Sequence, residues 1–507
     1  MTVTGSGSAL PISCPTYSVG RGGAAGSARR VIAVVLCLAL ALLVCLVGGR
    51  PANAQELNSL PYEVAAINTS GPKVFAHYFP PYPISLDNQD PSTDYYTRHY
   101  LNPDGENGKF LAVGGLLRDR PAGRKPLSGD YKLTDATTEV RQAASSGIDG
   151  FTINIMNWSG ANWDRTLLLA KAASQSGTGF KSIPNIDLSA DSARTASIAT
   201  IAAQLNTFYA QSSAYRLPDG RYVLSSFKAE GQPASWWQSI ATTMEQTYGK
   251  KIALITVFLD LTDARIASYS PVSYAMSIWG LRTAESVRVS PDKAGKVHNA
   301  GMKWMAPIAI QDVRHHYMRY AESGNTETLR ASWTRALSDK SDMVQLITWN
   351  DYSESTQFAP SQGHSTAFLD LNGYYIAQFK KAQTPTITGD QVIITHRIQG
   401  YAKQPSEQTG VMDWTLSGTA TPPRDTVEAV TLLKAPATVT LRAGGKITTY
   451  TAPAGVYARV AELSRGEISA TVARGTTPVT SVTSPNLVSS YPTRWDLQYY
   501  AATSRGV

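Results

Sequence analysis

Eight short apolar stretches, rich in β-branched residues, alternate with longer segments of helical periodicity between residues 74 and 351. The apolar stretches cover residues 74–79, 150–155, 180–187, 221–227, 252–260, 273–279, 303–311 and 343–351. The segments of helical period cover residues 135–146, 162–176, 191–207, 234–248, 282–299 and 325–339. Strands that alternate with helices in this way predict an α/β fold, namely a (β/α)8 barrel of the TIM type. A doubly wound open sheet is the alternative, but no G-x-G-x-x-G follows any of the strands, which counts against its dinucleotide-binding form.

The pattern changes after about residue 385. Short alternating stretches separated by turn residues follow at 391–398, 426–433, 437–441, 448–451, 455–463 and 468–474. Short strands at this spacing are typical of an all-β sandwich. We therefore expect the barrel over residues 72–384 and a β-sandwich domain over residues 388–507.

Residues 1–54 have the pattern of a secretory signal peptide. The segment contains four arginines and no acidic residue, and residues 31–47 form an unbroken apolar run. Ala52-Asn53-Ala54 then provides a small-x-small cleavage pattern, so the mature chain is expected to begin near Gln55. An uncleaved anchor is the alternative, because the run is close to the lower length limit for a membrane span.

All three cysteines, Cys14, Cys37 and Cys45, lie in this N-terminal segment. The mature chain would therefore have no disulfide and no thiol chemistry, and its stability would depend on a large hydrophobic core. The chain has 46 basic and 38 acidic residues, and removal of the four N-terminal arginines leaves 42 against 38, a net charge of +4. Since the mature sequence has no basic stripe or run, nucleic-acid binding is not expected.

Polar and aromatic residues lie where the predicted strands end. In barrels of this type the chemistry takes place at the carboxyl ends of the strands. Those ends carry His77, Tyr78, Asn154, Asp187, Glu230, Asp260, Trp279, Gln311, Trp349 and Asn350. A single polar residue at a strand end is more often solvated than functional. Together, these residues predict a polar cleft with aromatic walls, which suits the binding of sugar rings.

The last predicted strand runs directly into a pair of carboxylates, Asp351 and Glu354. Hydrolysis of a glycosidic bond requires two carboxyl groups, one that protonates the leaving oxygen and one that acts as base or nucleophile. A D-x-x-E is weak evidence alone, because helix N-termini often carry such a pair as solvated charges. Its place at the end of the eighth strand makes Asp351 and Glu354 the candidate catalytic pair. Either of the two could be the acid.

A long connection, residues 85–133, follows the first predicted strand. It is rich in Asp, Tyr, Arg, Gly and Pro, and its segment 94–100 has more aromatic residues than disordered inserts normally carry. Connections of this length are usually functional or disordered. We expect this one to form a lid or a wall of the cleft.

Five segments carry a resemblance to a known family, and they occur in order along the chain. They are residues 74–78, 144–151, 179–187, 217–223 and 348–355. These segments resemble glycoside hydrolase family 71, the α-1,3-glucanases or mutanases. The resemblance implies a barrel followed by a β sandwich, inverting endo hydrolysis of α-1,3-glucan, and Asp351 and Glu354 as the catalytic pair. The chain departs from the family in Ser353, where members commonly have Gly, and in the long insert after the first strand.

The predicted partner is thus a polysaccharide, an α-glucan, and the reaction needs no metal or other cofactor. The candidate substrate-binding residues are His77, Tyr78, Asn154, Asp187, Glu230, Asp260, Trp279, Trp349 and Asn350. The protein is expected to be secreted and to have no stable membrane association after cleavage of the signal. The β sandwich is expected to support the barrel, with carbohydrate binding as the alternative, and to be unnecessary for the chemical step. The competing functions are a non-catalytic glucan-binding or cell-wall protein on a barrel platform, and a glycosidase of another linkage.

Overall fold

The structure is a computed structural model that describes residues 59–67, 70–415 and 421–506. The predicted signal peptide and its cleavage site lie outside the described residues. None of the helices in the described ranges has the length and apolar character needed to span a membrane.

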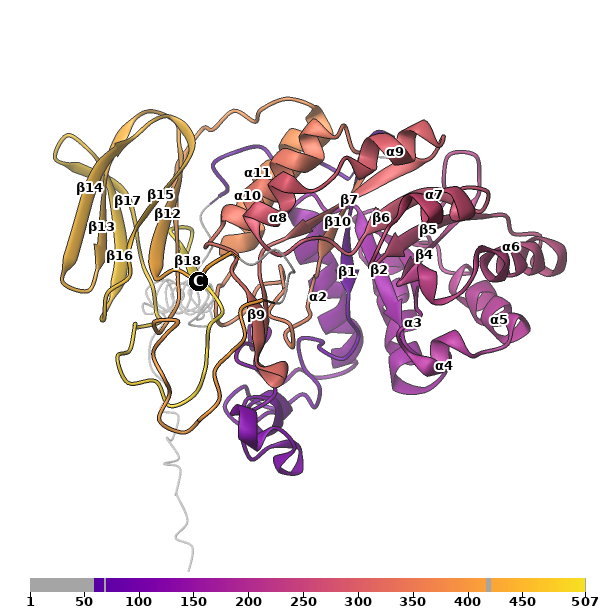
Figure 1. Cartoon of the computed structure of the whole chain (residues 1–507), viewed down its shortest axis with the longest axis horizontal. Coiled ribbons are helices and arrows are strands. Elements are labelled where there is room, and N and C mark those ends of the chain that lie inside the picture. The colour runs from indigo at the N-terminus through magenta and orange to yellow at the C-terminus, as the bar shows by residue number, and fades with distance from the viewer. Residues whose placement is uncertain (1–58, 68–69, 416–420, 507) are drawn as a thin grey trace, which may run out of the picture. The chain divides into compact units, whose positions relative to one another are not determined.

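Eight parallel strands close into a barrel, in the order β1-β10-β7-β6-β5-β4-β3-β2, and confirm the predicted (β/α)8 fold (Figure 1). The strands are β1 (Lys73–Tyr78), β2 (Gly150–Ile155), β3 (Lys181–Asp187), β4 (Tyr222–Phe227), β5 (Ile252–Phe258), β6 (Ser273–Ile278), β7 (Lys303–Ala309) and β10 (Met343–Ile347). In Figure 1 the insert that follows β1 and the β9 strand lie below the barrel strands, so the lower edge of the barrel in this view is its carboxyl end.

The helices around the barrel include all six predicted segments, two of which are divided, and two helices that were not predicted, at residues 263–269 and 367–381. They are α2 (Tyr131–Ser145), α3 (Gly160–Gln175), α4 (Asp191–Arg194), α5 (Ile198–Phe208), α6 (Ala234–Tyr248), α7 (Asp263–Tyr269), α8 (Ala284–Val289), α9 (Lys293–Asn299), α10 (Glu327–Ser338) and α11 (Ala367–Lys381). The predicted helix 191–207 breaks at Thr195, after which Ser197 caps α5. The predicted helix 282–299 breaks at Ser290-Pro291, because proline removes a backbone donor and disfavours helix in the residue before it.

The interior of the barrel is divided into an apolar and a polar zone. Residues that alternate along the strands pack inside it, among them Phe75, Ile183, Val223 and Ile255. Their neighbours, such as Val74 and Ala76 in β1, belong to the core between the barrel and its helices. Since successive side chains on a strand point to opposite faces, only every second residue at a strand end can face the barrel mouth.

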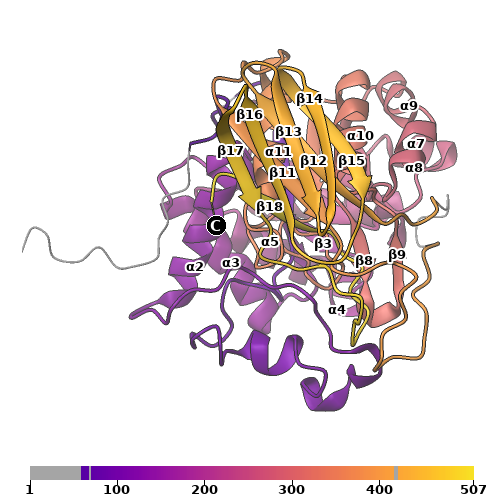
Figure 2. The same cartoon turned by 90° about the vertical axis from the view of Figure 1, so that its left-hand side faces the viewer.

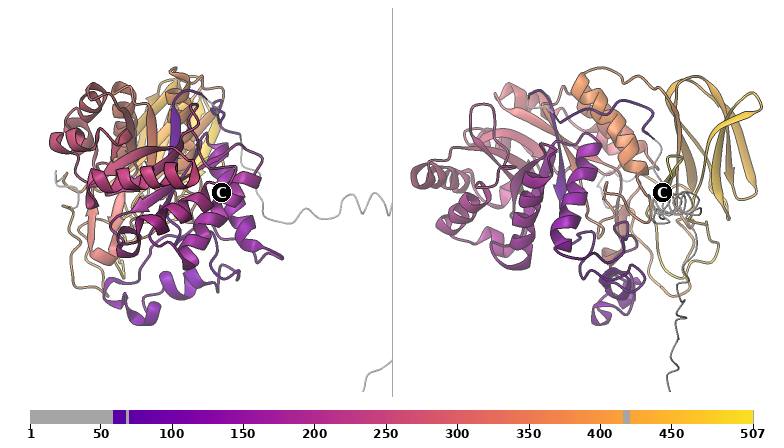
Figure 3. Two further views of the ribbon diagram at one scale, coloured as in Figure 1. Left: turned by 90° about the vertical axis from the view of Figure 1, so that its right-hand side faces the viewer. Right: turned by 180° about the vertical axis from the view of Figure 1, so that it is seen from behind.

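Two four-stranded antiparallel sheets form the predicted β sandwich (Figure 2). Their strand orders are β15-β12-β11-β18 and β14-β13-β16-β17. The strands are β11 (Asp390–His396), β12 (Thr426–Leu433), β13 (Ala437–Ala443), β14 (Lys446–Ala452), β15 (Gly455–Glu462), β16 (Ile468–Arg474), β17 (Thr477–Thr483) and β18 (Tyr500–Thr503). Helix α11 lies between the barrel and these sheets (Figure 3).

The connections of the sandwich return to the barrel, where they pack against a hairpin formed by β8 (Asp312–Arg314) and β9 (Arg319–Ala321). The backbone N–H of Tyr320 donates to the carbonyl of Asp413 at 2.8 Å, and that of Asp413 donates to Met318 at 2.8 Å. Trp495 and Leu497 pack in one apolar cluster with Val313 and Tyr320 of the hairpin. The segments that connect the sandwich strands thus contact a hairpin at the carboxyl end of the barrel. The expectation that the β sandwich is separable and unnecessary for the chemical step stays a prediction.

Candidate active site

The loop after β10 holds Asp351 in a fixed turn. The Oδ1 atom of Asp351 accepts hydrogen bonds from the backbone N–H of Ser353 at 3.0 Å, from its hydroxyl at 2.6 Å and from the backbone N–H of Glu354 at 3.3 Å. The backbone N–H of Asp351 itself donates to the hydroxyl of Thr348 at 2.8 Å. Three donors on one carboxylate oxygen stabilise its ionised form and fix its orientation.

The carboxyl group of Glu354 points to a different partner. Its Oε1 atom lies 3.1 Å from Nη1 of Arg314 on the β8–β9 hairpin, and its side chain is 21% exposed. The hairpin and the loop are joined by backbone as well, because the N–H of Val313 donates to the carbonyl of Glu354 at 2.8 Å. The hydroxyl of Ser355 donates to the carbonyl of Val313 at 3.0 Å. The position of Glu354 therefore depends on the hairpin.

A third carboxylate, Asp312, lies behind this pair and is 1% exposed. Arg314 donates to it through Nε at 2.7 Å and through Nη2 at 2.8 Å, as a bidentate pair. Arg282, which follows β6, donates from Nε to the Oδ2 atom of Asp312 at 3.0 Å. Asp312 thus binds both guanidinium groups of the site.

The electrostatics of the site favour a proton on Glu354. Burial, with additional repulsion from Asp312 and Asp351, raises the pKa of Glu354 to about 8 against the opposing effect of Arg314 and Arg282. Burial also raises the pKa of Asp351, but its three hydrogen-bond donors and Arg314 oppose this increase. Acid–base catalysis requires two carboxyl groups whose environments give them different pKa values, so that one is protonated while the other is ionised.

The residues after β1 form one wall of the site. The pKa of Tyr82 is raised, chiefly by burial and then by the negative charge of Asp351, and Ser353 interacts with its hydroxyl. Asn350 holds this segment in place, because its Nδ2 donates to the carbonyls of Tyr82 at 2.8 Å and Phe79 at 3.0 Å. Asn350 thus joins the loop after β10 to this wall.

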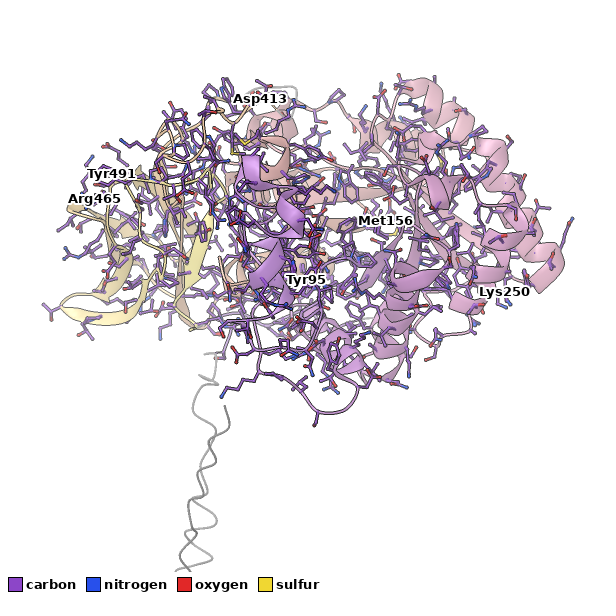
Figure 4. The ribbon with its side chains drawn as sticks, turned by 90° about the horizontal axis from the view of Figure 1, so that it is seen from below. Tyr95, Met156, Lys250, Asp413, Arg465 and Tyr491 are labelled. Atoms are coloured by element: carbon purple, nitrogen blue, oxygen red, sulfur yellow. The ribbon has the colours of Figure 1, made fainter. Side chains whose placement is uncertain are left out.

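Buried hydrogen bonds and an ion pair hold the insert 85–133 together, and its role as a lid or a wall of the cleft stays a prediction. Asp94 accepts from both terminal nitrogens of Arg120, at 2.7 and 2.5 Å, and both side chains are buried. Asp119 accepts from Ser361 at 2.5 Å and so binds the insert to the segment after the Asp351–Glu354 loop. Figure 4, which views the molecule from below, shows Tyr95 of this insert and Met156, the residue after β2, on the same face.

Inward-facing polar side chains line the barrel mouth. The Oγ1 atom of Thr152 lies 3.3 Å from Nδ1 of His77 and accepts from Gln345 at 2.7 Å. Asn154 donates to Asp187 at 3.0 Å, and the ring of Trp279 meets that of His77 edge to face at 4.8 Å. Burial lowers the pKa of His77 to about 3, so its ring is neutral. The structure therefore brings together four predicted residues, namely His77, Asn154, Asp187 and Trp279.

Two predicted residues, Tyr78 and Trp349, point away from this mouth. The hydroxyl of Tyr78 donates to Oε2 of Glu139 in α2 at 2.8 Å, and the indole N–H of Trp349 donates to Oε1 at 3.2 Å. Tyr78 is adjacent to the inward-facing His77, so the alternation of the strand turns it towards the helices. The ring of Trp349 is completely buried. A stacking role for Trp349 and a sugar contact by Tyr78 do not fit these positions.

Glu230 and Asp260 lie at the rim but not in the polar cluster. Glu230 accepts from the backbone N–H groups of Leu259 and Asp260, each at 3.1 Å. The side chain of Asp260 is 70% exposed and lies 2.9 Å from Arg265. These contacts describe a local connection between the ends of β4 and β5. Gln311 is likewise occupied, because it accepts from the backbone N–H of Tyr499 at 2.7 Å.

The sequence analysis missed Tyr82, Arg282, Asp312 and Arg314 around the carboxyl pair, and it missed Glu139, which binds Tyr78 and Trp349 away from the mouth. Asp312 and Arg314 follow the seventh predicted strand as D-V-R, a spacing that puts both on one side of a strand. That spacing is a weak signal, and their partners Arg282 and Glu354 are distant in sequence. In the sequence, Glu139 looks like an ordinary helix residue, although burial raises its pKa to about 8.

Among the described residues, no group of three or more His, Cys, Asp or Glu is arranged to hold a metal ion.

A parallel barrel with two carboxyl groups after one strand and a polar, aromatic-walled mouth defines a class of protein, the barrel glycoside hydrolases. The chain belongs to glycosyl hydrolase family 71, whose family model matches residues 127–502. This confirms the family inferred from the five sequence segments.

Two curated relatives and one solved structure illustrate the similarity. A mutanase of Penicillium rubens is 26% identical over 375 residues, which are 68% of this chain and 79% of the relative. The ascus wall endo-1,3-alpha-glucanase of Schizosaccharomyces pombe is 25% identical over 249 residues, 46% of this chain and 56% of the relative. The GH99 endo-alpha-mannosidase from Bacteroides thetaiotaomicron aligns with a TM-score of 0.46 and 12% identity, over 61% of this chain and 98% of that chain.

Proposed function

We propose that this protein is a secreted, endo-acting α-1,3-glucan hydrolase in which Glu354 is the general acid and Asp351 the general base. The observation that carries the proposal is the pair of differently held carboxyl groups after β10. The names of the two curated relatives, a mutanase and an endo-1,3-alpha-glucanase, support the choice of α-1,3-glucan. The signal-like segment 1–54 supports secretion.

The contacts of the two carboxyl groups support the assignment of acid and base. Asp351 accepts three hydrogen bonds that favour its ionised form, whereas the negative charges of Asp312 and Asp351 both disfavour ionisation of Glu354. The base must be ionised and the acid protonated when the substrate binds. Glu354 would give its proton to the leaving oxygen while Asp351 takes one from the attacking water.

The family resemblance implies inversion of the anomeric centre. Asp351 is held by its own loop and Glu354 contacts Arg314 on the hairpin, so the two carboxyl groups have different partners. An inverting enzyme needs its two carboxyl groups about 6.5–9.5 Å apart, because a water molecule must fit between the base and the sugar. Proton NMR of the first product should therefore show the β anomer from an α-linked substrate, and an α anomer would contradict the proposed inversion.

The polar mouth supplies groups that suit sugar hydroxyls. Beneath the mouth, the buried oxygens of Asn185 (Oδ1) and Gln345 (Oε1) have no hydrogen-bond partner among the described residues. Unpaired buried acceptors are costly, and a water molecule below the bound sugar would satisfy them. Trp279, which is only partly buried, offers an aromatic surface beside them.

The test of this function is the release of reducing sugar by the purified mature chain from insoluble α-1,3-glucan, compared with α-1,4-, α-1,6- and β-1,3-glucans. Activity on α-1,3-glucan alone would support the proposal. Preference for another glucan would overturn the linkage, and binding of glucan without product would indicate a non-catalytic protein.

The pH dependence of the reaction follows from the two carboxyl groups. Since the acid must be protonated, kcat/KM should fall as the pH rises past about 8, the pKa of Glu354. Since the base must be ionised, kcat/KM should also fall at low pH, at a pH above the ordinary range of an aspartate because the pKa of Asp351 is raised. A bell-shaped profile of kcat/KM on a soluble α-1,3-linked oligosaccharide is the expected result. A profile that stays flat through pH 9 would contradict the role of Glu354.

A further inference from the structure

The carboxyl pair of this site is surrounded by more charge than the reaction itself requires. Glu354 faces Asp351 on its own loop, Asp312 and Arg314 on the β8–β9 hairpin, and Arg282 after β6. Tyr82 also faces the pair, but its pKa is raised and its hydroxyl stays neutral.

His316 lies beside Arg314 on the hairpin. Burial, followed by the nearby Arg314 charge, lowers the pKa of His316 to about 4. Its ring is therefore neutral near pH 8, where Glu354 titrates. The charge balance of the site therefore depends on three carboxyl groups and two guanidinium groups.

Counting these charges shows why the site retains a proton. Arg282 and Arg314 contribute two positive charges, and the ionised forms of Asp312 and Asp351 balance them. Ionisation of Glu354 would add a third negative charge to a largely buried cluster. Because unbalanced charge is expensive in a medium of low dielectric constant, the neutral arrangement is the one with a protonated Glu354.

Asp312 determines this balance without touching the reacting atoms. Its carboxylate is 1% exposed and binds Arg314 in two places and Arg282 in one. The third nitrogen of the Arg314 guanidinium, Nη1, is left to contact Glu354. A planar guanidinium held at two nitrogens is fixed in orientation, so Asp312 also determines where Arg314 meets Glu354.

We propose that Asp312 is a positioning residue that fixes Arg314 against Glu354 and, by balancing the two guanidinium charges, keeps the proton on Glu354 until the leaving oxygen takes it. This inference rests on the proposed role of Glu354 as the acid. When Glu354 has lost its proton to the leaving oxygen, Arg314 lies in contact with the new carboxylate and stabilises it. No bond is made or broken at Asp312.

The proposal is tested with two substitutions that change the charge of the cluster in opposite directions. Asp312→Asn removes a negative charge, so the alkaline limb of the kcat/KM profile should move to lower pH by about 1–3 pH units. Arg282→Gln removes a positive charge, so that limb should move to higher pH. The substrate is a soluble α-1,3-linked glucose oligosaccharide, and folding is checked by circular dichroism at each pH. Should Asp312→Asn not fold, the direction of the Arg282→Gln shift decides alone.

A second substrate separates protonation from general damage to the site. Fluoride is a leaving group that needs little protonation, so on the α-glycosyl fluoride of the same oligosaccharide Asp312→Asn should lose much less turnover than on the oligosaccharide. The matched control is Asp149→Asn, which removes a buried carboxylate that pairs with Lys380 at 2.7 Å before β2. This variant should lose stability and keep the wild-type alkaline limb.

Equal losses on both substrates, with an alkaline limb that does not move in either variant, would overturn the proposal and leave Asp312 a purely structural residue. Glu354→Gln is measured in the same series. If Glu354→Gln retains turnover of the oligosaccharide, the assignment of the acid itself fails. If Glu354→Gln is inactive but the alkaline limb of the kcat/KM profile of Asp312→Asn does not move, only the inference about Asp312 fails.

Discussion

Replacement of Glu354 by Gln should lower turnover of an α-1,3-linked oligosaccharide by about 10²–10⁴-fold, the usual contribution of one general acid or base. The substitution keeps the shape of the side chain but removes its proton-donating group. On the α-glycosyl fluoride of the same oligosaccharide the loss should be much smaller, because the leaving group no longer needs the acid. Initial rates on both substrates measure the difference.

Asp351→Asn should behave differently from Glu354→Gln. A base that activates water is needed whatever the leaving group, so turnover should fall on both substrates, again by about 10²–10⁴-fold. Asp263→Asn is a suitable control, since its carboxyl is 75% exposed and pairs with Lys296 on the outside of the barrel. If the two substrates distinguish Asp351→Asn rather than Glu354→Gln, acid and base are exchanged in our assignment.

The architecture could be predicted from the sequence because its signals are local. All eight barrel strands lie close to the predicted stretches, since buried parallel strands produce continuous apolar runs that end at turn residues. Helix α11 was not predicted. It is buried between the barrel and the sheets, where Phe368, Leu371 and Ile376 share the interior with Asp370 and Asn372. A helix covered on all sides has no polar face, and the amphipathic signal is lost.

The site could be predicted only in part, because its geometry depends on side-chain direction and on distant partners. A strand end supplies two adjacent candidates, and only the direction of the pleat decides that His77 rather than Tyr78 faces the mouth. The same uncertainty made Trp349 a stacking candidate, whereas its indole packs against α2. Asp351 was found because the last predicted strand stretch, residues 343–351, ends on it. Asp312 was not, because its importance comes from Arg282 and Arg314, and no local pattern reports that contact.

Replacement of Arg397 by Met should destabilise the protein by about 3–5 kcal/mol, the usual cost of leaving one member of a buried ion pair without its partner. Arg397 follows β11 and lies 2.9 Å from Glu322, which follows β9, and neither side chain is more than 1% exposed. Its guanidinium also packs 4.4 Å from the ring centre of Tyr499, whose hydroxyl donates to Glu322 at 2.8 Å. The free energy of unfolding, from denaturant titration at pH 7, measures the loss.

The double variant Glu322→Gln with Arg397→Met shows how much of the lost free energy of unfolding comes from the unpaired charge of Glu322 and how much from the lost packing of Arg397. If the charge dominates, the double variant should be more stable than Arg397→Met alone, because no ion is then left buried. Lys446→Met is the surface control: its 2.7 Å contact with Glu462 is largely exposed, so its loss should cost less than about 1 kcal/mol. Because Glu322 directly follows the hairpin that carries Arg314, Arg397→Met should also lower kcat at temperatures where the variant is folded. An unchanged kcat, together with a small loss of stability, would mean that the β sandwich does not support the β8–β9 hairpin.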